Sequence, residues 1–122
     1  MSKLELCKIL SAIEQQDTLI TLINNTANPT AMAQTVRDRA YVQRASFVYE
    51  AMGVAAKLGY VVGVRVDPAD LTWPVCCIEL PDAGEVSWHM PAYATPYAGY
   101  GTEEKYARVH AYIQGKSLFV DQ

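Results

Sequence analysis

The chain has few of the residues on which disulfide-stabilised and zinc-dependent proteins rely. Among its 122 residues are three cysteines, Cys7 and the adjacent pair Cys76 and Cys77, and two histidines. The odd cysteine count has no CxxC spacing and no companion histidines at zinc-finger distances, so neither a disulfide framework nor a metal site is predicted. We expect the three cysteines to be buried thiols in a reducing compartment.

The common catalytic motifs are also missing. The sequence lacks G-x-S-x-G, H-E-x-x-H, a paired-carboxylate motif and the phosphate-binding G-x-x-x-x-G-K-[ST]. Ser87 and His89 lie two residues apart on a predicted strand and point the same way, which keeps a small phosphoesterase using His89 as the least favoured function. We expect a protein that is not an enzyme and that needs no cofactor.

The sequence has neither an excess of basic residues nor a long apolar run. A formal net charge of -3 argues against duplex DNA or an anionic membrane as the main partner, since both attract basic surfaces. No stretch reaches the ~18 uncharged apolar residues of a membrane helix, and the start of the chain has no signal-peptide core. We therefore expect a cytoplasmic protein. Apolar residues make up 51% of the chain, enough for a single domain, 1–122, with its own core.

What is present begins with a helical part, residues 1–58. Ser2 and Glu5 make a capping box at the start of a first helix. A stripe with three- and four-residue spacing follows, made of Leu6, Ile9, Ile13, Gln16, Ile20 and Ile23. This spacing fits either a core helix of the chain itself or a helix between subunits, and both interpretations remain open.

A second helix is predicted from near Thr30 to Leu58. We expect Val36 to face inward and the alanine-rich second half, with Gly53, to be closely packed. The first half carries three basic residues, Arg37, Arg39 and Arg44. They form either a solvated helical face or a second site, which would bind an acidic partner or a cyclic nucleotide at a subunit boundary.

From residue 60 the apolar period changes to two, which predicts strands at 60–66, 73–80 and 85–90. The last two are joined by the turn residues 81–84, so the region 60–90 is expected to be a small antiparallel sheet of three or more strands. Alternation predicts an apolar face covering the helices, made of Val62, Val64, Val66, Val86, Trp88 and Met90. The opposite face gathers Arg65, Glu79, Ser87 and His89. It is either a solvated surface with an Arg65–Glu79 pair or a ligand surface.

Residues 91–101 are too rich in glycine and proline for regular structure, yet they carry three tyrosines. Tyr97 and Tyr100 offer flat surfaces that stack on a nucleobase, while Arg65 or Arg108 meets phosphate oxygens. Alternatively, the tyrosines seal a core edge or a subunit interface. A last helix is predicted at 102–113, capped by Thr102, with Glu103 in its first turn. The predicted class is α+β: two long N-terminal helices, a small antiparallel sheet and a C-terminal helix.

Several short segments together resemble a known family. They are 47–55 (FVYEAMGVA), 73–75 (WPV), 78–81 (IELP), 84–90 (GEVSWHM) and 101–106 (GTEEKY). The combination is similar to the first-described type of phage Thoeris anti-defence (Tad-type) sponge proteins, and the similarity covers roughly residues 46–113.

The resemblance implies a phage protein acting in the cytoplasm of its bacterial host. Members of that family sequester glycocyclic ADP-ribose, the signal made by a TIR-domain enzyme, without cleaving it, and so inhibit Thoeris defence. They form dimers that build higher oligomers with pockets at subunit boundaries, and some also hold cyclic oligonucleotides. The resemblance therefore implies a homodimer or higher homo-oligomer that binds a small cyclic nucleotide and needs affinity, not catalysis.

The resemblance assigns ligand roles to Trp88 and His89 on the strand, to Thr102 and Glu103 at the helix start, and to Arg108 one turn beyond. Where the family pattern has Asp-Gly-His before Thr-Glu-Glu, this chain has residues 98–101 (AGYG), so the role of that histidine would pass to Tyr100. A function of another class also stays open, namely a protein–protein inhibitor or assembly module that acts through the N-terminal helix.

Overall fold

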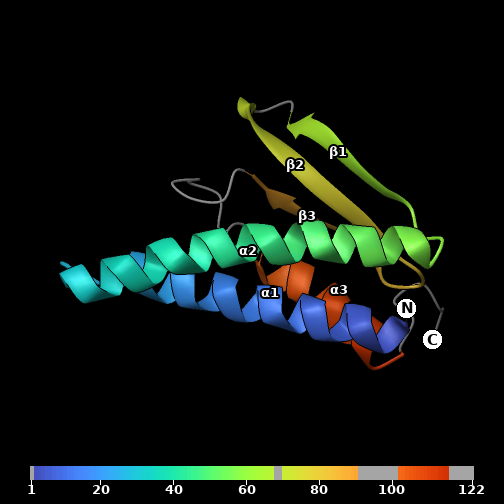
Figure 1. Cartoon of the computed structure of the whole chain (residues 1–122), viewed down its shortest axis with the longest axis horizontal. Coiled ribbons are helices and arrows are strands. Elements are labelled where there is room, and N and C mark those ends of the chain that lie inside the picture. Colours follow the sequence, from blue (N-terminus) through green and yellow to red (C-terminus); the bar gives the residue numbers. More distant parts are fainter. Residues whose placement is uncertain (1, 68–69, 91–101, 116–122) are drawn as a thin grey trace.

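The computed structural model describes residues 2–67, 70–90 and 102–115, which form a layer of helices beside a sheet (Figure 1). The elements are α1 (Lys3–Asn24), α2 (Ala31–Lys57), β1 (Val62–Asp67), β2 (Asp70–Leu80), β3 (Gly84–His89) and α3 (Thr102–Ile113). The predicted α+β class, with two long N-terminal helices, an antiparallel sheet and a C-terminal helix, is confirmed.

Side-chain oxygens set the starts of both long helices. The hydroxyl of Ser2 accepts a hydrogen bond from the backbone N–H of Glu5 at 3.1 Å, and that of Thr30 accepts from Ala33 at 3.1 Å. Beyond the end of α2, Gly59 has a φ of +87°, a left-handed conformation that glycine adopts without strain. α1 and α2 run antiparallel, and the half of the pair nearest their connection extends beyond the sheet (Figure 1).

The apolar stripe of α1 packs within the chain itself. Its five apolar members, Leu6, Ile9, Ile13, Ile20 and Ile23, are all buried. Gln16 is only half-buried, and the neighbouring Asp17 takes the buried position between Ile13 and Ile20. The stripe is thus part of the core and includes one buried carboxylate, that of Asp17.

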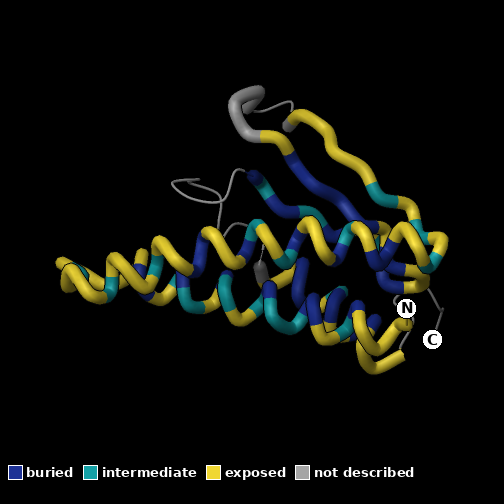
Figure 2. Tube along the Cα trace, in the orientation of Figure 1, coloured by how far each residue is buried: buried dark blue, intermediate teal, exposed yellow. Residues whose placement is uncertain are grey.

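Two expectations for α2 are wrong. Val36 is 39% exposed, because it lies in the projecting half of the helix pair, where the sheet gives no cover (Figure 2). Gly53 is exposed, and a Cβ added to it would meet no atom within 4 Å. The close packing of the second half of α2 comes instead from its buried alanine and valine face.

The sheet has the order β1-β2-β3 with both pairs antiparallel. The turn between β2 and β3 holds Asp82 at φ +63° and Gly84 at φ +110°, so the predicted hairpin is confirmed. The register places Val64 opposite Cys76 and Cys76 opposite Trp88, which sets these three residues on the face toward the helices.

The predicted apolar face of the sheet is only partly covered. Val86, Trp88 and Met90 are buried, whereas Val64 and Val66 are 63% and 54% exposed, so the expectation for these two valines is wrong. β1 is the strand farthest from α3 and diverges from α2, and only its first residue, Val62, packs against the core (Figures 1 and 2).

The cysteines divide by burial. Cys76 and Cys77 are buried, but Cys7 is only half-buried, which corrects the expectation for that thiol. Burial raises the pKa of each of the three thiols, so they stay protonated and unreactive near neutral pH. In the residues that the structure describes, no helix is long and apolar enough to cross a membrane.

Candidate functional site

The predicted site residues lie in two separate places. Trp88 and the backbone of His89 belong to a charged cluster inside the molecule, whereas Arg65 and Arg108 meet on and beside the sheet. Tyr97 and Tyr100 lie outside the described residues.

The interior cluster is built around Asp17 of α1 and Arg44 of α2, which are 1% and 0% exposed. Arg44 Nε lies 2.5 Å from Asp17 Oδ1. The other carboxylate oxygen of Asp17 accepts a hydrogen bond from the hydroxyl of Tyr106 in α3. One carboxylate therefore ties all three helices together. The expectation that Arg44 belongs to a solvated helical face is wrong.

The cluster holds more positive than negative charge. Lys105 of α3 is 8% exposed, and its Nζ lies 4.0 Å from Asp17 Oδ2. Two cations, Arg44 and Lys105, thus share one carboxylate. Burial lowers the pKa of Lys105 from 10.5 to about 8, although the Asp17 charge opposes this shift. Lys105 is still mostly charged at neutral pH.

Arg44 also has unused hydrogen-bonding capacity. Its Nη1 donates to the carbonyl oxygen of His89 at 3.0 Å. Its Nη2 is buried and has no hydrogen-bond partner among the residues that the structure describes. A buried guanidinium nitrogen without an acceptor is costly, and an anion placed beside it would remove that cost.

Aromatic residues form one wall of the cluster. Trp88 Nε1 donates to the hydroxyl of Tyr106 at 3.2 Å, and Lys105 Nζ lies 5.6 Å from the centre of the Trp88 ring. Trp88 is fully buried, so it has no face against which a ligand can stack in this conformation. It lines the cluster and fixes the phenol that holds Asp17.

The cluster lies where both ends of the tyrosine-rich segment 91–101 join the described structure. Before that segment, Met90 is buried, and its Sδ lies 3.8 Å from Arg44 Nη1. After it, Thr102 is the first residue of α3, and Lys105 follows within one turn. The predicted loop therefore starts and ends beside the excess positive charge.

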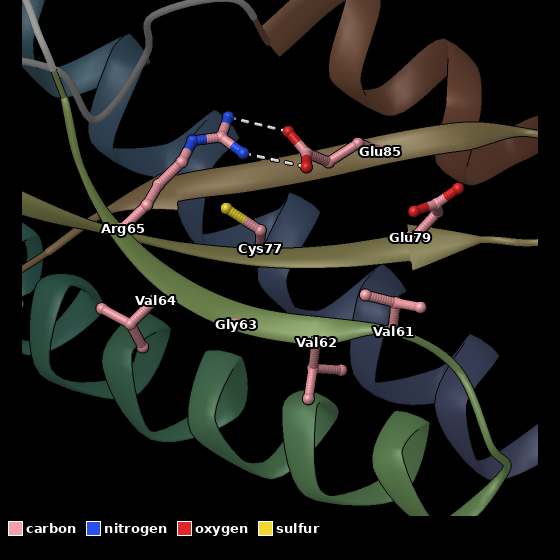
Figure 3. Close-up of a pocket in the computed structure, with 8 residues that line it drawn as sticks. All are labelled: Val61, Val62, Gly63, Val64, Arg65, Cys77, Glu79 and Glu85. Atoms are coloured by element: carbon pink, nitrogen blue, oxygen red, sulfur yellow. Dashed lines mark hydrogen bonds and ion pairs between the residues drawn. The ribbon is translucent and has the colours of Figure 1, made fainter.

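The outer face of the sheet carries the second group (Figure 3). Arg65 of β1 reaches across Cys77 to Glu85 of β3, with Nη1 2.9 Å from Oε2 and Nη2 2.7 Å from Oε1. The expected Arg65–Glu79 pair is wrong, because β3 brings Glu85 within reach of both guanidinium nitrogens. These residues line a hollow of about 150 Å³. The hydrogen bonds from Arg65 hold the pKa of Glu85 below its usual value.

Arg108 approaches the same glutamate from α3. Its Nη1 donates to the backbone carbonyl oxygen of Glu85 at 3.1 Å. The two predicted phosphate-binding arginines thus converge on one residue, although they lie far apart in the sequence. Glu79 lies beside Glu85 on β2, so the charges here are balanced: Arg65 and Arg108 against two carboxylates.

Glu103 lies on the outer side of α3, in a hollow that Tyr106 of the interior cluster also lines. It is exposed and lines a hollow of about 360 Å³ between α1 and α3, together with Glu14 and His110. His110 Nε2 lies 2.7 Å from Glu14 Oε1. The side chains of this hollow carry two carboxylates and one imidazole, which suits an anion less well than the interior cluster does.

The fold and the site define the chain as an α+β protein with a buried cluster of excess positive charge beneath its last helix. Comparison with protein-family models, with curated proteins and with solved structures finds no match to this chain. The function of the chain is therefore inferred from its own residues.

Proposed function

We propose that the protein binds and sequesters a cyclic nucleotide signal of the glycocyclic ADP-ribose type without cleaving it, and thereby inhibits Thoeris anti-phage defence. The observation that carries this proposal is the interior cluster, in which Arg44 and Lys105 share Asp17 and Arg44 Nη2 has no described partner. The resemblance of segments between residues 46 and 113 to Tad-type sponge proteins supplies the identity of the ligand.

The charge and the donors of the cluster favour an anionic ligand. Phosphate oxygens are acceptors only, and a guanidinium group together with an ammonium group is the usual protein arrangement for them. Arg44 Nη2 is buried, so a pyrophosphate reaches it only when the residues that cover it move; there it would occupy the unused donor and balance the second cation. A neutral acceptor would occupy the donor but leave the second cation unbalanced, so an anion is favoured.

The position of the cluster favours a nucleotide among anions. Segment 91–101 carries Tyr97 and Tyr100, and both of its ends join the structure beside Arg44 and Lys105. Tyrosine rings stack on a nucleobase, while the cations hold the phosphates. The wall formed by Trp88 lies too deep for stacking, so we assign that role to the tyrosines.

A sponge works by mass action and does not need turnover. It must outcompete the effector for free signal, which requires a dissociation constant below about 1 μM, or roughly -8 kcal/mol. We propose that the protein acts as a homo-oligomer in the host cytoplasm. Arg37 and Arg39 lie on the projecting half of the helix pair and remain candidates for a second site that takes cyclic oligonucleotides.

The test is titration calorimetry of the pure protein with glycocyclic ADP-ribose. The protein is then denatured by heat, and the ligand that it releases is identified by chromatography. The proposal predicts sub-micromolar binding and recovery of intact ligand. Recovery of altered ligand would make the protein an enzyme, and the absence of binding would refute the sponge function.

The same titration with variants separates the two groups of residues. Lys105→Met should weaken binding at least tenfold, whereas Lys57→Met, at an exposed position, should leave it unchanged. Arg108→Ala should cost ~1.5 to 3 kcal/mol of binding if its guanidinium meets a phosphate, with the exposed Arg39→Ala as its control. Equal affinity of Lys105→Met and wild type would exclude the interior cluster as the site.

One observation favours the alternative function, a protein–protein inhibitor or assembly module. The projecting half of the helix pair exposes Leu22, Met32 and Val42, which are 65%, 78% and 54% exposed. These exposed side chains are available to a protein partner, whereas the apolar stripe of α1, through which this function was expected to act, is buried within the chain. This alternative predicts that Val42→Lys relieves inhibition of Thoeris defence in infected cells while no nucleotide binds.

A further inference from the structure

The two edges of the sheet differ in how they are protected. Arg108 donates to the carbonyl oxygen of Glu85 and Arg44 to that of His89, at 3.1 and 3.0 Å. Met90 N donates to Pro74 O, and the antiparallel alternation counted from this bond turns the backbone groups of Glu85 and His89 away from β2. Two arginines therefore cap the free edge of β3.

The free edge of β1 is apolar and open. Val64 and Val66 are 63% and 54% exposed, and β1 is exposed along most of its length (Figure 2). Within the part of the chain that the structure describes, β2 is the only strand beside β1. An exposed, apolar edge strand is a template for pairing with another strand.

The register shows which backbone groups of β1 are available. Glu79 N donates to Val61 O at 2.9 Å, so the alternation points the backbone groups of Gly63 and Arg65 toward β2. The N–H and C=O groups of Val62, Val64 and Val66 consequently point outward. These residues are also the three valines whose side chains share one face of the sheet.

We propose that β1 pairs antiparallel with β1 of a second copy of this chain, about a two-fold axis at Val64. Val64 then lies opposite Val64 of the second copy, and Val62 lies opposite Val66 of that copy. All three outward-pointing residues form hydrogen-bonded pairs, and the two sheets join into one of six strands. The axis makes the contact closed and isologous, as expected for a dimer.

The side chains of β1 suit a second copy of the same strand. The valines meet valines across the junction, and cross-strand pairs of β-branched residues stabilise a sheet. Arg65 lies opposite Gly63 of the second copy, so the two arginines do not face each other and their ion pairs with Glu85 persist. With the axis at Arg65, the Arg65 side chains of the two copies would lie opposite each other and repel. This repulsion disfavours that register and favours the axis at Val64.

Disulfide trapping tests this register. In a Cys7→Ser, Cys76→Ala background, which removes the cross-strand neighbour of residue 64, Val64→Cys should form an intermolecular disulfide, because directly paired Cα atoms lie about 5.5 Å apart, within disulfide range. Val61→Cys is the matched control, because residue 61 is about as exposed as residue 64. In the proposed pairing, however, residue 61 of one copy lies six positions, or roughly 20 Å, from residue 61 of the second copy. Equal yields for the two variants, or no disulfide from Val64→Cys, would overturn the proposal.

Sedimentation of the ligand-free protein gives the second measurement. Val64→Lys places two lysines opposite each other and should raise the dimer dissociation constant at least tenfold, while Tyr49→Lys on the exposed face of α2 should not. Dissociation by Val42→Lys with Val64→Lys still dimeric would move the interface to the helices and refute the β1 pairing. No nucleotide is needed, so failure of the proposed sponge function would leave this test unaffected.

Discussion

Two arginine–carboxylate pairs of this molecule have similar geometry and opposite surroundings. Arg44 and Asp17 lie 2.5 Å apart and are almost wholly buried, while Arg65 and Glu85 lie 2.7 Å apart with side chains that are 53% and 45% exposed. Water screens the second pair and not the first. Distance alone therefore says little about what each pair contributes.

The pairs also differ in their charge balance. Around Arg65 the neighbouring charges cancel, because Arg65 and Arg108 together are matched by Glu79 and Glu85. Around Arg44 they do not, because Lys105 adds a second cation beside the single carboxylate of Asp17. A buried imbalance costs stability in the free protein and is reduced when an anion binds. This difference is why we place the ligand at the interior cluster.

The largest expected effect comes from breaking the buried pair. Arg44→Met should lower the free energy of unfolding by about 3 to 5 kcal/mol, because it leaves Asp17 buried without its guanidinium partner. Urea denaturation measures this. The triple variant Asp17→Leu, Arg44→Met, Lys105→Met should recover much of the loss, because it leaves no unpaired charge in the cluster. A loss below about 1 kcal/mol for Arg44→Met would show that the pair is solvated.

Lys105 makes the interior cluster sensitive to pH. Its pKa is about 8 in the folded protein and about 10.5 when unfolded, so between these values the unfolded chain binds more protons and stability rises with pH. The rise, relative to Lys105→Met, should approach about 3 kcal/mol by pH 10.5. Thermal unfolding of both proteins from pH 7 to 10 checks this. Parallel curves would show that Lys105 has an ordinary pKa.

The exposed pair should have the smallest effect. Arg65→Ala should cost about 0.2 to 1 kcal/mol of stability, and the cost should shrink in 1 M salt. It should also raise the pKa of Glu85, whose low value depends mainly on hydrogen bonds from Arg65. NMR titration of the Glu85 carboxylate measures the second effect. A cost as large as that of Arg44→Met would remove the contrast between the pairs.

Most of the fold could be predicted because local signals and packing agree. Ser2, Thr30 and Gly59 mark helix ends by chemistry that acts within one turn, and the turn at 81–84 fixes the β2–β3 hairpin. The exposure of Val64 and Val66 could not be predicted, since alternation assigns a face but does not tell how far the helices extend beneath it.

The interior cluster was missed for a different reason. Asp17 lies four residues after Ile13 and three before Ile20, and Arg44 lies four residues from both Ala40 and Val48. A charged residue at a core position on each of two neighbouring helices is the signal that would have found the pair. The apolar spacing of α1 allows either residue 16 or residue 17 to take the buried position of the stripe. In α2, the neighbouring basic residues favoured the interpretation of Arg44 as part of a solvated face. Only the packing of α1 on α2 distinguishes these cases.

The most direct test of the interior site is the affinity for glycocyclic ADP-ribose at pH 7 and pH 9, for wild type and Lys105→Met. Because Lys105 loses its proton near pH 8, we expect wild-type affinity to fall up to about tenfold between these values, and the already weaker variant to show no such fall. Tight wild-type binding that is equal at both pH values and unchanged in Lys105→Met would contradict the account.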